Sequence, residues 1–413
     1  MKESGIDWIG QIPEEWEISK IRYLVTTRSE KRITDSSVPY IGLENIESQT
    51  GKFVETGIQV DKSENIVVEI GDILFGKLRP YLRKYWRATF TSTASSEFLV
   101  FQSSELDMNF LYYAIQSDSF IEEVNTSTYG SKMPRASWEY IKNMKIAFPT
   151  SLVEQQKIAD FLDKKTTQLD KVKSLLEEQI QKLKDYRASL IYETVTKGLD
   201  KTVPMKDSGI DWIGQVPQGW GVKPLKYLAS YDDETLTQSE INSNQKINYV
   251  DIGAVEFTKG INGYQELLMS EAPSRARKIA KKGDTIISTV RTYLKAIAYL
   301  NDDYIVSTGF CVVRPKKVNS KYLNYTIMSD SFTGPVSKYA WGVSYPAISS
   351  SQLVNIPIPF PESIEEQLSI VDYLDHKMLQ INQLIDIKQE QIDNINKQRQ
   401  TLIYDYVTGK RRV

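Results

Sequence analysis

The residue types that most often carry enzyme chemistry are scarce in this sequence. Its 413 residues include one histidine, His376, and one cysteine, Cys311. A cysteine–histidine zinc site is therefore not expected, nor is a disulfide within the chain. No G-x-x-x-x-G-K-[ST] phosphate loop, no G-x-S-x-G elbow and no Asp/Asn-Pro-Pro-Tyr/Phe tetrapeptide of amino-methyltransferases occurs. We predict no catalytic residue and no metal site, with His376 on a solvated helix and Cys311 buried and inert.

Two clusters of basic and aromatic residues offer a different chemistry, the binding of DNA. The first consists of Lys77, Arg79, Tyr81, Arg83 and Lys84, and the second consists of Arg275, Arg277, Lys278, Arg291, Tyr293 and Lys295. Lysine and arginine neutralise DNA phosphates, and arginine also reads guanine edges. We predict that these residues contact DNA; the alternative is that they form a solvated strand face or loop.

Two glycine-containing loops add aromatic and polar side chains to these clusters. Residues 129–135 read YGSKMPR, and residues 341–347 read WGVSYPA. Loops of this composition on a rigid body suit recognition of base edges, although they are equally common as ordinary turns. The contacts predicted from these loops are Lys132, Arg135, Trp341 and Tyr345.

These side chains must be positioned by a duplicated framework. Residues 4–16 read SGIDWIGQIPEEW and residues 208–220 read SGIDWIGQVPQGW, with ten of thirteen positions identical. Residues 149–198 match residues 361–410 at 19 of 50 positions. The offset grows from 204 to 212 between these matches, which places insertions at 17–39 and 48–70, in surface loops. The period is domain-sized, unlike the shorter period of a solenoid.

The first two-thirds of each repeat predict a mixture of strands and helices. In the first repeat, short β-branched or aromatic runs predict strands at Val38–Leu43, Ile66–Ile70, Asp72–Phe75, Glu97–Phe101 and Lys145–Phe148. A helix is expected over Met108–Phe120. Strand order cannot be derived from these runs.

The last third of each repeat predicts one long helix. No glycine or proline occurs from Glu154 to Thr196, and apolar residues recur at heptad spacing. Ser151 and Ser363 are the expected N-caps, and Gly198 and Gly409 the expected ends. A helix of about 65 Å with an apolar stripe needs a partner, and we expect the two helices to pack on each other. The residues predicted to pack are Leu162, Leu169, Val172, Leu176, Leu183, Leu374, Met378, Ile381, Ile385 and Ile392.

Composition limits the remaining possibilities. The chain is 41% hydrophobic and 25% charged, which is typical of globular domains and excludes wholesale disorder. The net charge of −2 gives no global signal for nucleic acid. No run of about 18 apolar residues predicts a membrane span, and the N-terminal residues lack the apolar core of a signal peptide. We expect a cytoplasmic protein without membrane contact.

Taken together, these motifs resemble the specificity subunit of type I restriction–modification enzymes over essentially the whole chain. Four features carry the resemblance: the duplicated Ser-Gly-Ile-Asp-Trp-Ile-Gly lead-in, the Gly-Asp segment with a downstream arginine, the Pro-x-x-x-x-x-Glu-Gln element that opens each long helix, and the closing Leu-Ile-Tyr-x-x-Val-Thr. Each is short, but their duplicated order is specific.

The resemblance implies a role and a set of partners. Each globular part would be a target recognition domain that reads one half of a bipartite, asymmetric site in double-stranded DNA. The helices would hold the domains apart and dock two modification subunits, which bind S-adenosylmethionine and methylate adenine. Restriction subunits, where present, would add translocation driven by ATP and Mg²⁺. This chain would hold no cofactor of its own.

The expected fold is therefore α+β, with two recognition domains, each followed by a long helix, and the helices paired as an antiparallel coiled coil with pseudo-twofold symmetry. The predicted bounds are 1–150 and 205–360 for the recognition domains, and 151–204 and 361–413 for the helical regions. Two alternatives stay open. A protein-binding scaffold would lack strongly salt-dependent DNA binding, and a nuclease would cleave DNA in the presence of a divalent metal.

Overall fold

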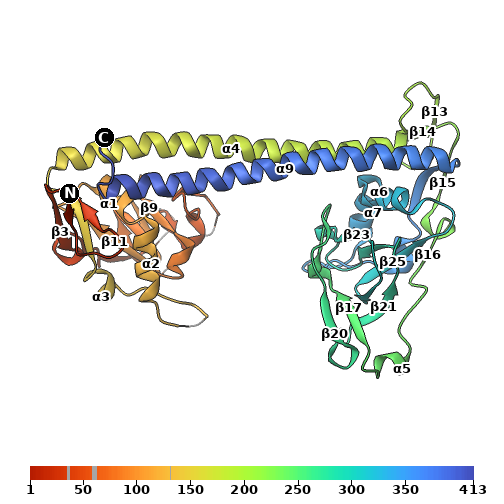
Figure 1. Cartoon of the computed structure of the whole chain (residues 1–413), viewed down its shortest axis with the longest axis horizontal. Helices are drawn as coiled ribbons and strands as arrows, with labels where there is room; N and C mark the ends of the chain where they lie inside the picture. The colour runs from red at the N-terminus through yellow and green to blue at the C-terminus, as the bar shows by residue number, and fades with distance from the viewer. Residues whose placement is uncertain (35–37, 58–62, 131) are drawn as a thin grey trace. The chain divides into compact units, whose positions relative to one another are not determined.

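The chain forms two compact units, seen here in a computed structural model that describes residues 1–34, 38–57, 63–130 and 132–413 (Figure 1). Unit 1 comprises Met1–Glu178 and Lys388–Val413, and unit 2 comprises Gln179–Ile387. Each unit combines one globular part with the start of the helix that follows it and the end of the other long helix. The predicted boundaries divide the chain in sequence order, whereas each compact unit includes the end of the other repeat's long helix.

The first repeat contains twelve strands, three short helices and one long helix within its described residues. The strands are β1 (Lys2–Glu3), β2 (Gln11–Ile12), β3 (Trp16–Lys20), β4 (Thr26–Thr27), β5 (Lys31–Ile33), β6 (Tyr40–Ile41), β7 (Glu64–Val68), β8 (Ile73–Gly76), β9 (Tyr85–Arg87), β10 (Ser92–Ala94), β11 (Phe98–Gln102) and β12 (Lys145–Pro149). The helices are α1 (Met108–Ala114), α2 (Asp118–Thr126), α3 (Trp138–Ile141) and α4 (Leu152–Lys197), with 3₁₀ turns η1 (Ile21–Tyr23), η2 (Leu43–Asn45) and η3 (Pro80–Leu82).

The second repeat has a similar order of elements, but it lacks a counterpart of β5 and adds three strands and one short helix. Its strands are β13 (Met205–Asp207), β14 (Gln215–Pro217), β15 (Trp220–Pro224), β16 (Ala229–Tyr231), β17 (Lys246–Val250), β18 (Val255–Glu256), β19 (Gly260–Ile261), β20 (Gln265–Leu268), β21 (Ala276–Ala280), β22 (Thr285–Ser288), β23 (Ile297–Tyr299), β24 (Tyr304–Ser307), β25 (Phe310–Pro315) and β26 (Pro357–Pro361). Its helices are α5 (Gln238–Ile241), α6 (Ser320–Met328), α7 (Asp330–Tyr339), α8 (Ser350–Leu353) and α9 (Ile364–Val407), with 3₁₀ turns η4 (Leu225–Tyr227), η5 (Ile252–Ala254), η6 (Met269–Glu271) and η7 (Thr292–Leu294).

One four-stranded sheet is the same in both units. It has the order β4-β11-β8-β9 in unit 1 and β16-β25-β22-β23 in unit 2. The register is also preserved, because Phe98 pairs with Gly76 and Phe310 with Ser288, each displaced by 212 positions. Its inner face joins α1 and α2, or α6 and α7, in the largest buried core of each unit. The long helices contribute residues to the same cores.

The second four-stranded sheet differs at its edge. Its order is β5-β7-β10-β6 in unit 1 and β20-β17-β24-β21 in unit 2. Strand β5 lies within residues 17–39, and β20 lies in the second-repeat segment that corresponds to 48–70, so the two regions of changing offset contain edge strands as well as loops. Residues 35–37 and 58–62 of these regions lie outside the described residues.

Three expectations about local structure need correction. The strand predicted over Val38–Leu43 is only Tyr40–Ile41, and Leu43 begins the 3₁₀ turn η2. The helix predicted over Met108–Phe120 is two helices, because Ser117 ends the first and accepts a hydrogen bond from the backbone N–H of Phe120 as N-cap of the second. The strand predicted to reach Ile70 ends at Val68, and the Ile70 side chain is exposed. The predicted strand at Lys145–Phe148 is confirmed as β12.

The repeated tryptophan of the lead-in anchors the long helix that follows. Trp16 Nε1 donates to Glu154 Oε1 over 3.1 Å, and Trp220 Nε1 donates to Glu366 Oε1 over 2.9 Å. Both indole rings are otherwise buried, and a buried indole N–H needs such an acceptor. The lead-in and the Glu-Gln element therefore form one structural contact in each unit.

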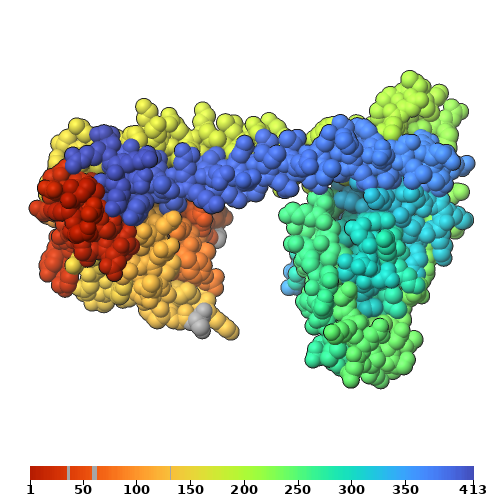
Figure 2. Space-filling view, viewed as in Figure 1, coloured from red at the N-terminus to blue at the C-terminus, as the bar shows by residue number. Residues whose placement is uncertain are grey.

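The closing motif binds the lead-in from the opposite helix end. In unit 1 the Tyr404 hydroxyl near the end of α9 donates to the carbonyl of Trp8 over 3.0 Å. In unit 2 the Tyr192 hydroxyl near the end of α4 donates to the carbonyl of Ile213 over 3.3 Å. Figure 2 shows the end of α9, in dark blue, against the N-terminal segment, in red. Each lead-in thus holds the start of one long helix and the end of the other.

The two long helices pack in antiparallel directions, as predicted. In unit 1 the ring of Phe161 lies 4.5 Å from that of Tyr406, and Asp170 pairs with Arg399 at 3.5 Å. Residue numbers therefore rise along α4 while they fall along α9. In unit 2 Arg187 Nη1 donates to Asn382 Oδ1 over 2.7 Å.

The residues predicted to pack between the long helices differ in burial. Leu162, Leu374, Ile381 and Ile392 are buried, and Leu169, Leu176, Leu183, Met378 and Ile385 are partly buried. Val172 is 47% exposed and does not belong to the seam. The alternation of three and four residues from Leu169 to Leu176 passes through Lys173, whose side chain is only 20% exposed. The heptad position is therefore occupied by Lys173 and not by the apolar Val172. A lysine can take such a position because its aliphatic stem packs against the other helix.

Candidate nucleic-acid interface

Each unit carries an exposed structure that joins a 3₁₀ turn to a loop. We call these structures tip 1 (77–83 and 129–135) and tip 2 (289–295 and 341–347). Ser131, in the loop of tip 1, lies outside the described residues. Turn η3 follows β8, and turn η7 follows β22, at corresponding ends of the shared sheet. The tips therefore occupy the same place in the two folds.

Tip 1 is held together by the backbone around Arg79. The Arg79 N–H donates to the carbonyl of Pro134 over 2.7 Å, and its Nη2 donates to the carbonyl of Lys132 over 3.1 Å. The Arg135 guanidinium forms a two-pronged ion pair with Glu97 at 3.0 Å, and these bonds raise the pKa of Arg135. Tyr81 lies at the centre of the turn and is exposed.

Tip 2 presents more aromatic surface. The Arg291 guanidinium lies over the ring of Tyr345, 4.7 Å from its centroid, a contact that orients both side chains. Trp341 is 82% exposed, although its backbone is fixed by two hydrogen bonds with Ala347. Tyr293 is exposed as well. Large aromatic surfaces left in water are uncommon unless they bind something, and bases stack on such rings.

The backbone of both tips is strained at the same positions. Arg79 and Arg83 flank η3 with φ angles of 51° and 53°, and Arg291 and Lys295 flank η7 with φ angles of 49° and 47°. Residues with a Cβ rarely adopt this left-handed conformation, and such strain concentrates at functional sites. The same five-residue geometry occurs in both units, although much of the surrounding sequence differs.

Several predicted DNA contacts are instead occupied by partners within their own unit. Lys84 Nζ donates to two backbone carbonyls at 2.8 and 2.6 Å, and burial lowers the pKa of Lys84. Arg83 pairs with Asp118 at 2.6 Å, and Lys295 pairs with Asp330 at 2.8 Å. These residues stabilise the fold around the tips and are poor candidates for direct contact with phosphates.

The basic run at 275–282 belongs mainly to a different sheet from the one that carries tip 2. Its central residues lie on β21, which belongs to the second sheet. Lys278 is nearly buried and binds Asp232 at 2.7 Å and the carbonyl of Phe310 at 2.6 Å. Arg277 donates to the neighbouring Ala276 carbonyl, whereas Arg275 is exposed. Lys278 and Arg277 are therefore engaged within unit 2, whereas the Arg275 side chain stays exposed.

Other exposed tip residues were absent from the predicted contacts. Tyr129 and Met133 of tip 1 and Val343 of tip 2 are exposed large apolar side chains. All three lie in the two loops that composition had singled out. Their exposure could not be predicted from the sequence, because apolar side chains in loops pack into the core as often as they face solvent.

The only histidine and the only cysteine lie outside the tips. His376 is exposed on α9, where its ring contacts the Gln380 amide at 3.1 Å. Cys311 is buried in β25, and burial raises the pKa of its thiol to about 12. Among the described residues, no cluster of three or more His, Cys, Asp or Glu side chains could hold a metal ion, and no helix is long and apolar enough to span a membrane.

Comparison with known proteins assigns the chain to a DNA-specificity family. Residues 13–184 and 217–397 match the model of the type I restriction modification DNA specificity domain. The chain belongs to this family. The match covers both repeats and most of both long helices, and it confirms the resemblance seen in the duplicated motifs.

Individual relatives support the same assignment over the whole length. The type I restriction enzyme MjaVIII specificity subunit of Methanocaldococcus jannaschii is 25% identical over 432 residues, covering 98% of this chain and 94% of that protein. The EcoDI specificity subunit of Escherichia coli is 23% identical over 300 residues, covering 69% and 65%. The specificity-subunit family thus includes proteins with the same two-repeat length.

Solved structures share the fold. One chain from a study of assembly and conformational transition in the type I restriction–modification system aligns with a TM-score of 0.70 at 19% identity, over 96% of this chain and 98% of that chain. The HsdS subunit from Thermoanaerobacter tengcongensis aligns with a TM-score of 0.51 at 19% identity over all of both chains. The mixed α/β units and the paired long helices are therefore features of this fold.

Proposed function

We propose that this specificity subunit selects the DNA site of a type I restriction–modification complex, with each tip reading one half of a bipartite, asymmetric sequence. The observation that carries the proposal is the repetition of one strained backbone frame with different side chains. A conserved frame suits a common task, and altered side chains suit different targets.

The shared residues and the differing residues fit different parts of DNA recognition. Arg79 and Arg291, together with Tyr81 and Tyr293, occupy matching positions in the two tips. Side chains common to both tips suit contacts with the phosphates and sugars that every site contains. They would position the subunit without specifying its sequence.

The side chains that differ suit the reading of bases. Tyr129 in tip 1 corresponds to Trp341 in tip 2, and Lys132 and Met133 correspond to Ser344 and Tyr345. Base edges are distinguished by donor, acceptor and apolar groups on the protein. Two tips with such different groups are expected to read different half-sites, which makes the complete site non-palindromic.

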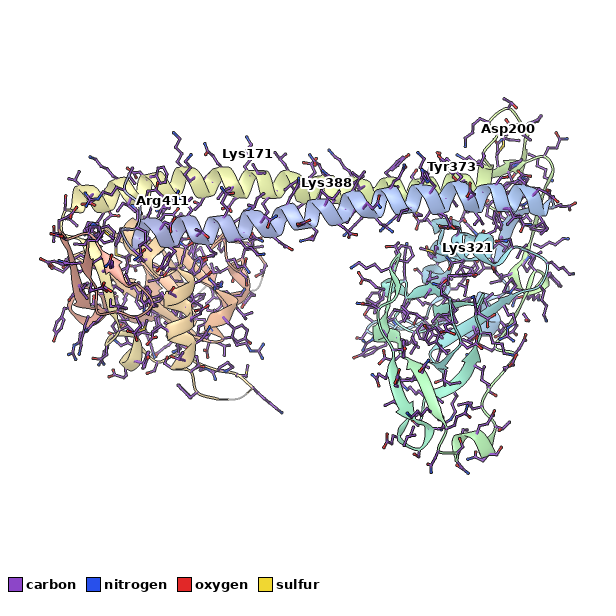
Figure 3. The ribbon with its side chains drawn as sticks, in the orientation of Figure 1. Lys171, Asp200, Lys321, Tyr373, Lys388 and Arg411 are labelled. Atoms are coloured by element: carbon purple, nitrogen blue, oxygen red, sulfur yellow. The ribbon has the colours of Figure 1, made fainter. Side chains whose placement is uncertain are left out.

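The helix pair supports the part of the proposal that concerns partners. Along α4 and α9, polar side chains such as Lys171 project away from the pair (Figure 3). We assign to this surface the docking of two methyltransferase subunits, which would bind S-adenosylmethionine. ATP and Mg²⁺ would be bound by restriction subunits where these are present. The chain would act in the cytoplasm, where these partners meet DNA, and would contribute no catalytic group.

The test is single-molecule sequencing of base modification in the source cell, with and without the gene for this chain. Loss of adenine methylation at one bipartite motif supports the proposal and reveals the site. Re-expression of Trp341→Ala should then relax the bases of one half-site and leave the other half unchanged. An unaltered methylation pattern after deletion would contradict the proposed role.

A further inference from the structure

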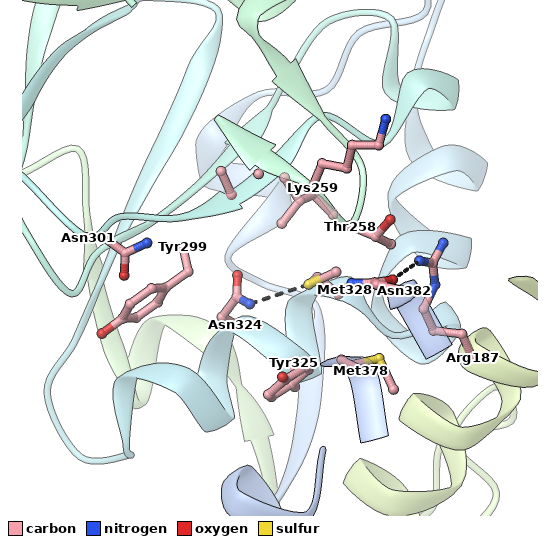
Figure 4. A pocket seen from close by; sticks show the side chains of 13 residues that line it. Arg187, Thr258, Lys259, Tyr299, Asn301, Asn324, Tyr325, Met328, Met378 and Asn382 are labelled. Atoms are coloured by element: carbon pink, nitrogen blue, oxygen red, sulfur yellow. Dashed lines mark hydrogen bonds between the residues drawn. The ribbon is translucent and has the colours of Figure 1, made fainter. Parts of the chain in front are cut away.

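Unit 2 contains a cavity of about 260 Å³ between its part of the helix pair and its globular part (Figure 4). The wall is formed by the β18–β19 hairpin, β23, α6 and the facing stretches of α4 and α9. In Figure 4, Asn324, Met328, Asn382 and Arg187 follow one another across the view. The cavity lies apart from tip 2, and the proposed reading of DNA does not use it.

The same place in unit 1 is filled. There the rings of Tyr85 and Tyr112 meet edge to face, with their centroids 5.9 Å apart, and both are buried. A Cβ added to Gly51 of unit 1 would overlap the Tyr112 hydroxyl. In unit 2 the repeat places Ile297 and Asn324 where the two tyrosines stand. Gly260 on the cavity wall of unit 2 has no atom of the described residues within 4 Å of an added Cβ.

The arginine beside this place also differs in its partners. In unit 1, Arg399 donates to Gln116 Oε1 at 3.3 Å and pairs with the Asp170 carboxylate at 3.5 Å. Its counterpart in unit 2 is Arg187, and the positions of Gln116 and Asp170 are taken by Met328 and Asn382. Asn382 thus puts a neutral amide where Asp170 has a carboxylate, and Met328 lacks the amide oxygen that Gln116 offers to the arginine.

Arg187 is consequently a half-buried cation without a carboxylate partner among the described residues. Among the described residues, the Arg187 guanidinium makes one hydrogen bond, to Asn382 Oδ1 at 2.7 Å. Burial lowers the pKa of Arg187. The other cation on the cavity wall, Lys259, pairs with Glu256 at 3.1 Å. A guanidinium removed from water is stable when an anion meets its remaining N–H groups.

Asn324 presents an unpaired hydrogen-bond acceptor to the same cavity. It is only 8% exposed, and its Nδ2 makes a weak contact with Met328 Sδ at 3.3 Å. Its Oδ1 is buried and has no hydrogen-bond partner among the described residues. Leaving such an acceptor unpaired costs about 1–3 kcal/mol, so a ligand that donates a hydrogen bond at this atom would be favoured.

We propose that this pocket of unit 2 binds a phosphate together with a hydroxyl, supplied either by inorganic phosphate, which keeps one P–OH at neutral pH, or by a small phosphate monoester that carries an alcohol hydroxyl. The charged oxygens pair with Arg187, and the hydroxyl donates to Asn324 Oδ1. The cavity accommodates either source, because its volume of about 260 Å³ is several times the roughly 30 Å³ that one water molecule occupies in the liquid. The bound anion would supply in unit 2 the negative charge that Asp170 supplies in unit 1.

Isothermal titration calorimetry of the full chain with inorganic phosphate tests the site. Asn382→Asp restores the carboxylate found in unit 1 and should weaken phosphate binding at least about tenfold, since the arginine then has an internal partner. Gln383→Glu is the matched control, because it adds the same charge at an exposed position one residue further along α9. Equal phosphate affinity in the wild type and Asn382→Asp, or no binding by the wild type, would overturn the proposal.

A second variant and two further probes make the test independent of one substitution. Ile297→Tyr combined with Asn324→Tyr should fill the cavity as in unit 1 and abolish binding, while thermal unfolding verifies that the variant is folded. Sulfate has no hydroxyl at neutral pH and should bind at least about tenfold more weakly than phosphate; equal affinity would contradict the contact with Asn324. Glycerol 3-phosphate distinguishes the sources, because tighter binding than phosphate identifies a monoester and weaker binding identifies the free ion.

Discussion

Arg79 and Arg291 show how a single residue can serve both the frame of a tip and its surface. The left-handed conformation costs roughly 1–2 kcal/mol for a residue with a Cβ. In tip 1 the hydrogen bond from Arg79 N–H to Pro134 helps to offset that cost. In tip 2 the bridge between Val290 and Ala347 holds the corresponding segment. The turn thereby fixes Tyr81 or Tyr293 at the surface next to the arginine.

Arg79→Gly and Arg291→Gly should each weaken DNA binding by the assembled complex. Glycine adopts the left-handed conformation without strain, so the change removes the guanidinium while it preserves the turn. Loss of a guanine contact should cost about 1–3 kcal/mol, whereas loss of a phosphate contact should reduce the salt slope by about one. Fluorescence anisotropy with a duplex that carries the methylated motif, over a series of salt concentrations, measures both.

Arg22→Ala is the control for these variants, because Arg22 also lies over an exposed tyrosine, 5.0 Å from the ring of Tyr23, but outside the tips. Affinities of both glycine variants equal to that of Arg22→Ala would exclude Arg79 and Arg291 as contacts.

Residue types identified the region of each tip from sequence, but they could not separate surface residues from internally paired ones. Arg135 finds Glu97 and Lys278 finds Asp232, partners that are distant in sequence and become neighbours only through sheet pairing. A single sequence does not show which residues sheet pairing brings together. Exposed Arg275 and buried Lys278 therefore looked alike.

At the scale of elements, the start of each long helix is fixed by one glutamine. Gln155 Nε2 donates to the carbonyl of Pro149, and its Oε1 accepts from the N–H of Asp107, both over 2.8 Å. Gln367 makes the equivalent bonds in unit 2, and both glutamines are 1% exposed. One buried amide therefore connects the last strand, the first short helix and the long helix of each unit.

Gln367→Leu should lower the free energy of unfolding by about 2–3 kcal/mol, because the carbonyl of Pro361 and the N–H of Asn319 lose their partner in a buried place. Urea unfolding of the full chain measures the change. Gln389→Leu, at an exposed position of the same helix, should change stability by less than about 0.5 kcal/mol. Similar losses in the two variants would show that the effect arises from helix composition and not from the buried bonds.

Elements with strong periodicity were predictable, and short elements were less so. Heptad spacing predicted α4 and α9, and the capping serines are confirmed, since Ser151 and Ser363 accept from the N–H groups of Glu154 and Glu366. The break at Ser117 escaped prediction because apolar residues continue on both sides of it. The two-residue and three-residue edge strands carry too few side chains to show a period.

At the scale of the whole molecule, duplication makes each unit depend on both repeats. The end of α9 completes unit 1, and the end of α4 completes unit 2. The sequence predicted antiparallel pairing from the repeated helix, but it could not show that Tyr404 binds Trp8. That contact joins residues nearly a full chain length apart, and only the folded arrangement shows which lead-in receives which helix end.

Removal of one heptad from both long helices should change the proposed DNA site without changing either tip. Deletion of Val172–Glu178 together with Lys388–Asn394 preserves the alternation of three and four residues and shortens each helix by about 10 Å. If the helix pair sets the distance between half-sites, the spacer of the methylated motif should shorten by about three base pairs, at about 3.4 Å each. Base-modification sequencing reads the new motif, and size-exclusion chromatography with the modification subunits verifies assembly.

Deletion from α4 alone should prevent assembly, because the packing faces of α4 and α9 then differ in length. A doubly deleted subunit that assembled and still methylated the original motif would refute the role of the helices as the spacer.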